Sequence, residues 1–355
     1  MVASAEPTLR AAPVAAATPK PWFIHGPYFD AACFIGMPLL AFGLIATFAL
    51  PRVEGQSFLG GLNTPAWLAV AAAVTTFTHI NLTVARLYLN KAVFRRFALR
   101  AVLAPILAFA ILATSSRLLA ASVVIVFFWD EWHSLLQTFG LGRIYDSKLG
   151  NDRSLGRWLD MGMCFAFEWL PYLVAITIIP FDSDDLVRDD MDAALARRAR
   201  FLPPEYFRYP LVILGAAFLA FYLFSYYRMS KRGYRVSPAK LALFACTALA
   251  NLLTLSFYTL LEASLMANIY HALQFIALIW VSERASLAKT FRTVRWPAGV
   301  AIAFLLVLLP CIAAGATRLV QNASSGPWLA LWLTASMLHF WSDGFIWSVR
   351  KDQAV

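Results

Sequence analysis

Ten apolar segments, most of them about 20 residues long, follow one another along this 355-residue chain. About 20 apolar residues in a helix are enough to cross the roughly 30 Å hydrocarbon core of a bilayer. Hydrophobic residues make up 60% of the chain and charged residues only 14%, which excludes an ordinary soluble domain. The sequence therefore predicts an all-α, polytopic integral membrane protein with about ten transmembrane helices, at 28–50, 65–89, 101–115, 118–141, 158–180, 209–228, 240–260, 262–282, 297–316 and 327–348. The third segment is short and the seventh and eighth are nearly continuous, so nine helices is the alternative count.

The rest of the chain adds no second folded domain. Residues 1–27 are rich in Ala and Pro and are expected to form a disordered tail. Residues 28–350 are predicted to form a single transmembrane domain. Within it, residues 181–208 begin acidic and end basic, which favours a short surface helix in an extracytoplasmic loop.

The distribution of Lys and Arg predicts the orientation in the membrane. The two ends of the chain and alternate loops between helices carry 21 of these residues, whereas the opposite side carries eight, five of them in 181–208. Because cytoplasmic loops are enriched in Lys and Arg, both termini are predicted to be cytoplasmic, in a bacterial-type inner membrane. The net charge of +10 is explained in the same way, so we expect no nucleic-acid partner.

Soluble catalytic motifs are missing from the sequence. It contains no Gly-rich phosphate loop or nucleotide fingerprint, and its four cysteines stand singly within apolar segments. Any chemistry should therefore take place in or beside the membrane.

Four histidines lie at one predicted depth. Each of four helices expected to run in the same direction carries one near its midpoint, namely His79, His133, His271 and His339. At 1.5 Å per residue, all four fall within roughly 5 Å of the bilayer midplane. Ionisable residues at this depth are costly and indicate function, so we predict that the four histidines share one site.

Carboxylates accompany these histidines. Asp130 precedes His133 by three positions and Asp343 follows His339 by four, so each pair shares a helical face and could supply metal ligands or orient an imidazole. Glu131 and Glu168 are further candidates, as ligands or as catalytic proton-transfer groups.

Three other polar residues are expected to have a structural role and no catalytic one. Arg86, Arg143 and Tyr145 lie near the predicted cytoplasmic ends of their helices, where anchoring at the membrane interface explains them.

A site of imidazoles and carboxylates without thiolates favours a transition metal, and we expect iron. Helix bundles hold non-haem iron in this way, with ligands projecting from facing helices. At the midplane such a metal could meet oxygen and a lipophilic small molecule. The leading hypothesis is a metal-dependent, non-haem oxidoreductase or oxygenase that acts on a lipophilic substrate, with membrane lipids and an electron donor as further partners.

Three alternatives remain, the simplest of which is a metal-free scaffold or assembly factor. Four histidines on four helices could instead form two bis-histidine pairs that ligate haem b. The shared depth and the nearby carboxylates count against this reading. A proton-coupled transporter could use the same carboxylates and histidines as a relay, although no inverted repeat is evident.

The HxxxH and HxxHH boxes of membrane fatty-acid desaturases do not occur, because no two histidines lie closer than 54 positions. In its dispersed intramembrane histidines and all-helical design, the chain resembles the bacterial Brp/Blh carotene-cleaving oxygenases. The likeness is one of architecture, without an alignable motif, and it implies oxygenase chemistry.

Overall fold

The computed structural model describes residues 22–53, 63–178, 205–320 and 326–347, and all regular secondary structure within them is helical. The main helices are α1 (Pro27–Asp30), α2 (Met37–Phe48), α3 (Ala66–Leu87), α4 (Lys91–Thr114), α5 (Ser116–Lys148), α6 (Arg157–Glu168), α7 (Leu170–Ile178), α9 (Arg208–Lys231), α10 (Pro238–Phe257), α11 (Leu260–Thr290), α12 (Gly299–Val320) and α13 (Gly326–Ile346). A π-helical turn, η1 (Ala31–Ile35), joins α1 to α2, and a 3-10 turn, η4 (Glu205–Phe207), precedes α9.

An integral membrane protein is supported by the length and apolar character of these helices. Seven of them are long and apolar enough to cross a bilayer, and the bent pair Pro27–Ile35 and Met37–Phe48 makes eight if it is one span. Each of the ten predicted segments coincides with a helix or with a broken pair of helices. The number of ten spans, and the cytoplasmic location of the termini, stay predictions.

Several helices extend beyond their apolar segments. Helix α4 begins at Lys91 instead of residue 101 and is kinked at Phe97, whose backbone is not helical. Helix α5 continues to Lys148 instead of 141, and α11 reaches Thr290 instead of 282. Hydropathy marks only the part of a helix that suits hydrocarbon, whereas its backbone hydrogen bonds can continue among polar side chains. The predicted fifth segment is broken at Trp169, between α6 and α7.

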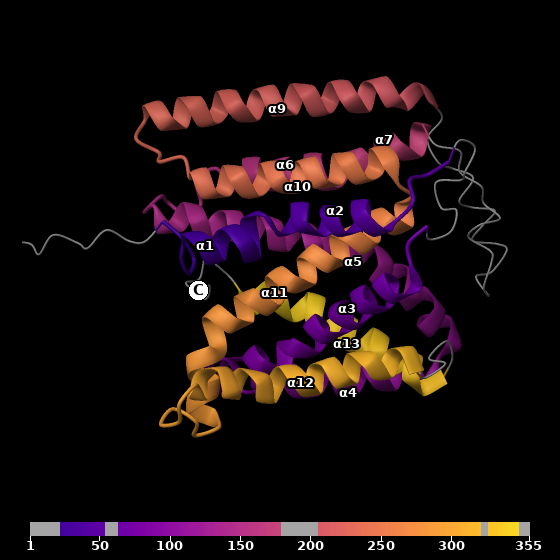
Figure 1. Ribbon diagram of the computed structural model, residues 1–355, viewed down its shortest axis with the longest axis vertical. Coiled ribbons are helices and arrows are strands. Elements are labelled where there is room, and N and C mark those ends of the chain that lie inside the picture. The colour runs from indigo at the N-terminus through magenta and orange to yellow at the C-terminus, as the bar shows by residue number, and fades with distance from the viewer. Residues whose placement is uncertain (1–21, 54–62, 179–204, 321–325, 348–355) are drawn as a thin grey trace, which may run out of the picture.

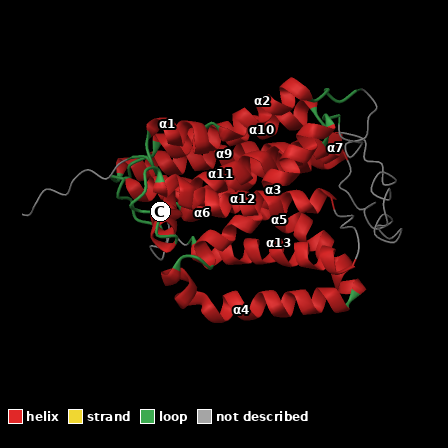
Figure 2. Ribbon diagram, turned by 60° about the horizontal axis from the view of Figure 1, so that its bottom comes forward, coloured by secondary structure: helices red, strands yellow, loops and turns green. Residues whose placement is uncertain are grey.

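The helices form one bundle in which α11 crosses the middle obliquely (Figure 1). Helix α11 packs against α2, α3, α10, α12 and α5, while α9 lies at one edge of the bundle and α4 at another (Figures 1 and 2). The central position of α11 brings His271 into contact with helices far away in sequence.

Most of the predicted disordered tail, most of the loop 181–208 and the C-terminal residues 348–355 lie outside the described residues.

Candidate metal centre

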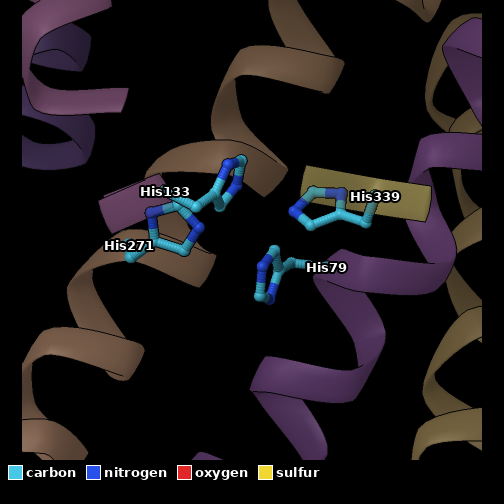
Figure 3. A group of neighbouring side chains, drawn as sticks. All are labelled: His79, His133, His271 and His339. Atoms are coloured by element: carbon cyan, nitrogen blue, oxygen red, sulfur yellow. The ribbon is translucent and has the colours of Figure 1, made fainter. Parts of the chain in front are cut away.

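The four histidines predicted to share a site converge in the centre of the bundle. One ligand atom from each of them lies within 4.8 Å of the others, and all four residues are buried. They come from α3, α5, α11 and α13, as Figure 3 shows. Helical geometry explains how they meet, because four helices that pass one another at the bundle centre can each present one side chain at the same level.

The four imidazole rings form a closed ring of neighbours. His79 lies edge-to-face with His271 and His339, at centroid separations of 4.9 and 4.7 Å. His133 completes the ring, 4.9 Å from His271 and 4.7 Å from His339. The interplanar angles lie between 73° and 85°, so the rings are not stacked and their edges surround a common centre.

Most of the imidazole nitrogens have no hydrogen-bond partner among the described residues. This is true of both nitrogens of His79, both of His271, Nε2 of His133 and Nε2 of His339. A buried polar atom without a partner costs roughly 1–3 kcal/mol, so a cluster of six such atoms needs an explanation. A metal ion bound by one nitrogen of each ring would account for four of the six.

One histidine is held by a neighbouring hydroxyl group. Thr83 Oγ1 lies 2.6 Å from Nδ1 of His339, and both residues are buried. Thr83 follows His79 by one turn of α3, so this helix contributes both an imidazole and the partner of another imidazole. The contact fixes the ring of His339 and leaves its Nε2 for the centre of the cluster.

The predicted carboxylates are divided between two positions. Asp343 lies at the cluster, where its Oδ2 is 3.6 Å from Nε2 of His133. Neither Asp343 nor Asp130 joins the converging ligand atoms, a group that contains only the four histidines among the described residues. Asp130 and Glu131 lie beside Asn268 and His271.

Glu168 lies on the same side as Asp130 and Glu131. Its Oε2 accepts a 3.4 Å hydrogen bond from Tyr270, the residue before His271, and Ser264 donates a 3.2 Å bond to Glu131. No cation within the described ranges forms an ion pair with Asp130, Glu131 or Glu168. A positive ion in the histidine cluster would partly balance these carboxyl groups, which otherwise are costly at membrane depth.

A cavity of about 430 Å³ begins at the histidine cluster. His133 and Asp343 line one end, and Arg143 and Arg157 line the other. Between them the wall comes from α5, α11 and α13 and is mostly apolar: Leu136, Phe139, Leu141, Ile144, Phe275, Leu278 and Phe340. The cluster is therefore accessible to a molecule larger than water.

Sequence reasoning missed a buried polar network near the ends of α5, α6 and α10. Lys240 Nζ contacts Asp146 Oδ2 at 2.7 Å and Asp160 Oδ1 at 3.2 Å, and Arg143 Nη1 contacts the same two carboxylates at 2.9 and 2.6 Å. Tyr222, Tyr226 and Tyr234 donate hydrogen bonds to these carboxylates.

Tyr234 belongs to the loop between α9 and α10. Burial, together with the adjacent Asp146 carboxylate, raises the pKa of Tyr234 above its ordinary value. Its hydroxyl therefore stays protonated and continues to donate to Asp146.

The interpretation of Arg86, Arg143 and Tyr145 as interface anchors was wrong. Arg143 and Tyr145 are buried, and the hydroxyl of Tyr145 donates a 3.0 Å hydrogen bond to Asp30. Arg86 pairs with buried Glu283 at 2.5 Å. Position near a helix end suggested exposure, but the surrounding helices extend far enough to cover these side chains. Charged residues of opposite sign near the ends of neighbouring segments were the available signal.

Comparisons of the sequence and the fold with known protein families, with curated proteins and with solved structures gave no match. The chemistry of the site is therefore argued from its own residues.

Proposed function

We propose that this protein is a membrane-embedded oxidoreductase that uses one iron ion, held by His79, His133, His271 and His339, to oxidise a lipophilic substrate. The observation that carries the proposal is the buried ring of four imidazoles whose ligand atoms lie within 4.8 Å of one another. Neutral imidazole suits iron, copper, nickel and zinc, and the donor set lacks the thiolates typical of structural zinc sites.

A single non-haem centre is favoured over two bis-histidine haems. All four rings surround one point, and each ring has two of the others as edge-to-face neighbours. A porphyrin inserted between any two of them would need the space that the remaining two imidazoles occupy. The proton-coupled transporter stays the alternative from a different functional class, based on Asp130, Glu131 and Glu168.

When bound, such a metal supplies one-electron and oxygen chemistry. The chain's own residues would position the substrate and control its surroundings. The cavity would give a substrate access to His133 and Asp343, while its apolar walls would exclude water from the rest of the cavity. Asp343, close to His133, is in place to orient this imidazole or to accept a proton at its Oδ1, which has no hydrogen-bond partner within the described ranges.

Metal content and the absorption spectrum test this proposal. We expect protein purified in lipid nanodiscs to contain one iron per chain and to lack a Soret band. Replacing His271 with Ala should reduce iron binding by more than the roughly 10- to 100-fold typical of losing a group that only orients a ligand. The matched control is His25→Ala, because His25 is the fifth histidine and is exposed on the surface.

Several outcomes would contradict the proposal. One zinc ion per chain would exclude redox chemistry at the metal. A Soret band would show that the protein binds haem instead of non-haem iron. Equal iron loss in the His25→Ala and His271→Ala variants would show that iron does not bind at the cluster. Protein without metal that drives proton-dependent uptake into vesicles would support the transporter.

A further inference from the structure

The cavity that begins at His133 has the dimensions of one acyl chain. Its wall on α5 is a continuous helical stripe made of His133, Leu136, Gln137, Gly140, Leu141 and Ile144. The eleven-residue separation of the first and last positions corresponds to about 16 Å along the helix. This is about half of the roughly 30 Å hydrocarbon core, which two acyl chains span end to end. The volume of about 430 Å³ also falls in the range of small-molecule sites.

Polar atoms at both ends of the cavity lack partners. At the inner end these are Nε2 of His133 and Oδ1 of Asp343, and at the outer end Nε of Arg143, in the part of the chain that the structure describes. The side chains of His133 and Arg143 are only 4% and 2% exposed, so bulk water does not solvate them. The proposed metal would occupy the imidazole at the inner end, so the buried N–H of Arg143 at the outer end is the donor that a ligand has to satisfy. An apolar passage that ends in such a donor suits an amphiphile with one polar head better than a hydrocarbon.

Two guanidinium groups, those of Arg143 and Arg157, line the outer end. Arg143 uses Nη1 for Asp146 and Asp160 and Nη2 for the carbonyl groups of Arg153 and Leu155, which leaves its Nε–H for a ligand.

Arg157 adds a further cation at this end of the cavity. Its guanidinium group lies 4.9 Å from the ring centre of Phe139, another lining residue. A planar guanidinium group beside an unsatisfied N–H is a good receptor for a carboxylate or phosphate.

We propose that the substrate is a single-chain amphiphile with an anionic head. The head binds Arg157 and the Nε–H of Arg143, and the chain extends along α5 so that its far end meets His133 and Asp343. That this ligand is a substrate rests on the proposed function of the metal centre. Binding itself depends only on the cavity and requires no metal.

Photo-crosslinking tests the orientation of the ligand. The probe is dodecanoate with a diazirine near its methyl end, applied to the full chain in zwitterionic nanodiscs, with the metal either retained or removed by a chelator. We expect mass spectrometry to find the label near His133 on α5 and near Phe340 on α13. Unlabelled dodecanoate or dodecyl phosphate should compete, and the stronger competitor identifies the head group. Dodecanol and dodecyltrimethylammonium should compete at least tenfold less well.

Variants of Arg157 test the head-group site. Arg157→Gln should weaken dodecanoate binding by about 10- to 100-fold, the usual effect of losing hydrogen bonds to a charged group, and Arg157→Lys should retain most of the affinity. The control is Arg284→Gln, since Arg284 also lies over an aromatic ring, that of Trp280 at 5.3 Å, but does not line the cavity.

Two results would overturn the inference. One is equal competition by the anionic, neutral and cationic amphiphiles. The other is a label confined to the apolar groove between α7, α9 and α10, which would mark ordinary membrane lipid. If either result is obtained with protein that contains one iron per chain, the inference about the amphiphile fails and the proposed metal function stands. If the label is found at His133 and Phe340 in a protein that never contains metal, the proposed metal function fails and the inference about the amphiphile stands.

Discussion

The contact between Thr83 and His339 gives a test of the proposed metal centre that leaves all four histidines in place. Thr83→Val keeps the shape of the side chain but removes the hydroxyl group 2.6 Å from Nδ1 of His339. Without it the ring can rotate or change its tautomer, so we expect iron affinity to fall by about 10- to 100-fold. Thr83→Ser should retain most of the affinity. Competition with a chelator of known affinity measures the change.

A control for this prediction lies on the same helix. Thr75 also carries a hydroxyl group, which donates to its own backbone at the carbonyl oxygen of Ala71. Thr75→Val should therefore leave iron affinity unchanged. If the two valine variants lose iron equally, the hydroxyl of Thr83 has no specific role at the centre.

Lys240 is expected to be important for stability. It is fully buried and contacts Asp146 and Asp160, so Lys240→Met leaves Arg143 alone with two carboxylates. Breaking a buried ion pair from one side costs roughly 3–5 kcal/mol. We expect the free energy of unfolding in detergent to fall by this order. Lys231→Met, at an exposed position on α9, should change it little, and a similar loss in both variants would refute the structural role of the network.

At the level of helices, the close packing of α12 against α3 positions His79. A Cβ atom on Gly315 of α12 would lie 3.0 Å from the carbonyl oxygen of Val74 and 3.2 Å from the backbone nitrogen of Thr78. Small residues allow helix backbones in membranes to approach this closely. Gly315→Leu should separate the two helices, with a cost of about 1–3 kcal/mol in unfolding free energy, and should also weaken iron binding because His79 follows Thr78 directly.

Gly43 on α2 provides the comparison, because a Cβ atom there would meet nothing within 4 Å. Gly43→Leu should leave both stability and iron content near the values of the unmodified protein. Normal iron binding in Gly315→Leu would show that α12 does not determine the position of His79.

The helices themselves could be predicted because membrane-spanning segments must be both long and apolar. Their ends could not, since α5 and α11 continue into regions where polar side chains hide the signal, and α4 is preceded by a further helical stretch beyond a kink at Phe97. The proximity of His79, His133, His271 and His339 could be predicted from their common depth in the membrane alone. Depth does not specify direction around the helix axis or which helices are neighbours. For this reason it could not be predicted that Asp343 would lie beside His133 and Asp130 beside His271, with neither among the converging ligand atoms.

At the scale of the whole molecule, the network around Lys240 could not be predicted from the depth of each residue in the membrane. Its members come from α5, α6, α9, α10 and the loop before α10, and each taken singly looks like a residue at the membrane interface. Only the three-dimensional packing reveals that opposite charges near several helix ends neutralise one another in a buried position. The same packing places Arg143 at the end of the cavity.

The orientation of the whole molecule determines from which side a substrate arrives. The cavity leads from the histidine cluster toward Arg143 and Arg157, near the loops at 149–156 and 232–237. These loops belong to the set rich in Lys and Arg that predicts a cytoplasmic location. An amphiphile with an anionic head would then reach Arg157 from the cytoplasmic leaflet.

Labelling of single introduced cysteines tests this orientation. Arg232, in the loop between α9 and α10, and Val53, after α2, are both exposed and belong to opposite predicted sides. In intact cells a membrane-impermeant maleimide should modify the Val53→Cys variant and leave Arg232→Cys unmodified until the membrane is opened. The native cysteines, Cys33, Cys164, Cys246 and Cys311, all lie within helical segments and should react little, as the unmodified protein will show. The reverse pattern would place the Arg157 end of the cavity outside the cell, so that its anionic ligand would have to come from the outer leaflet.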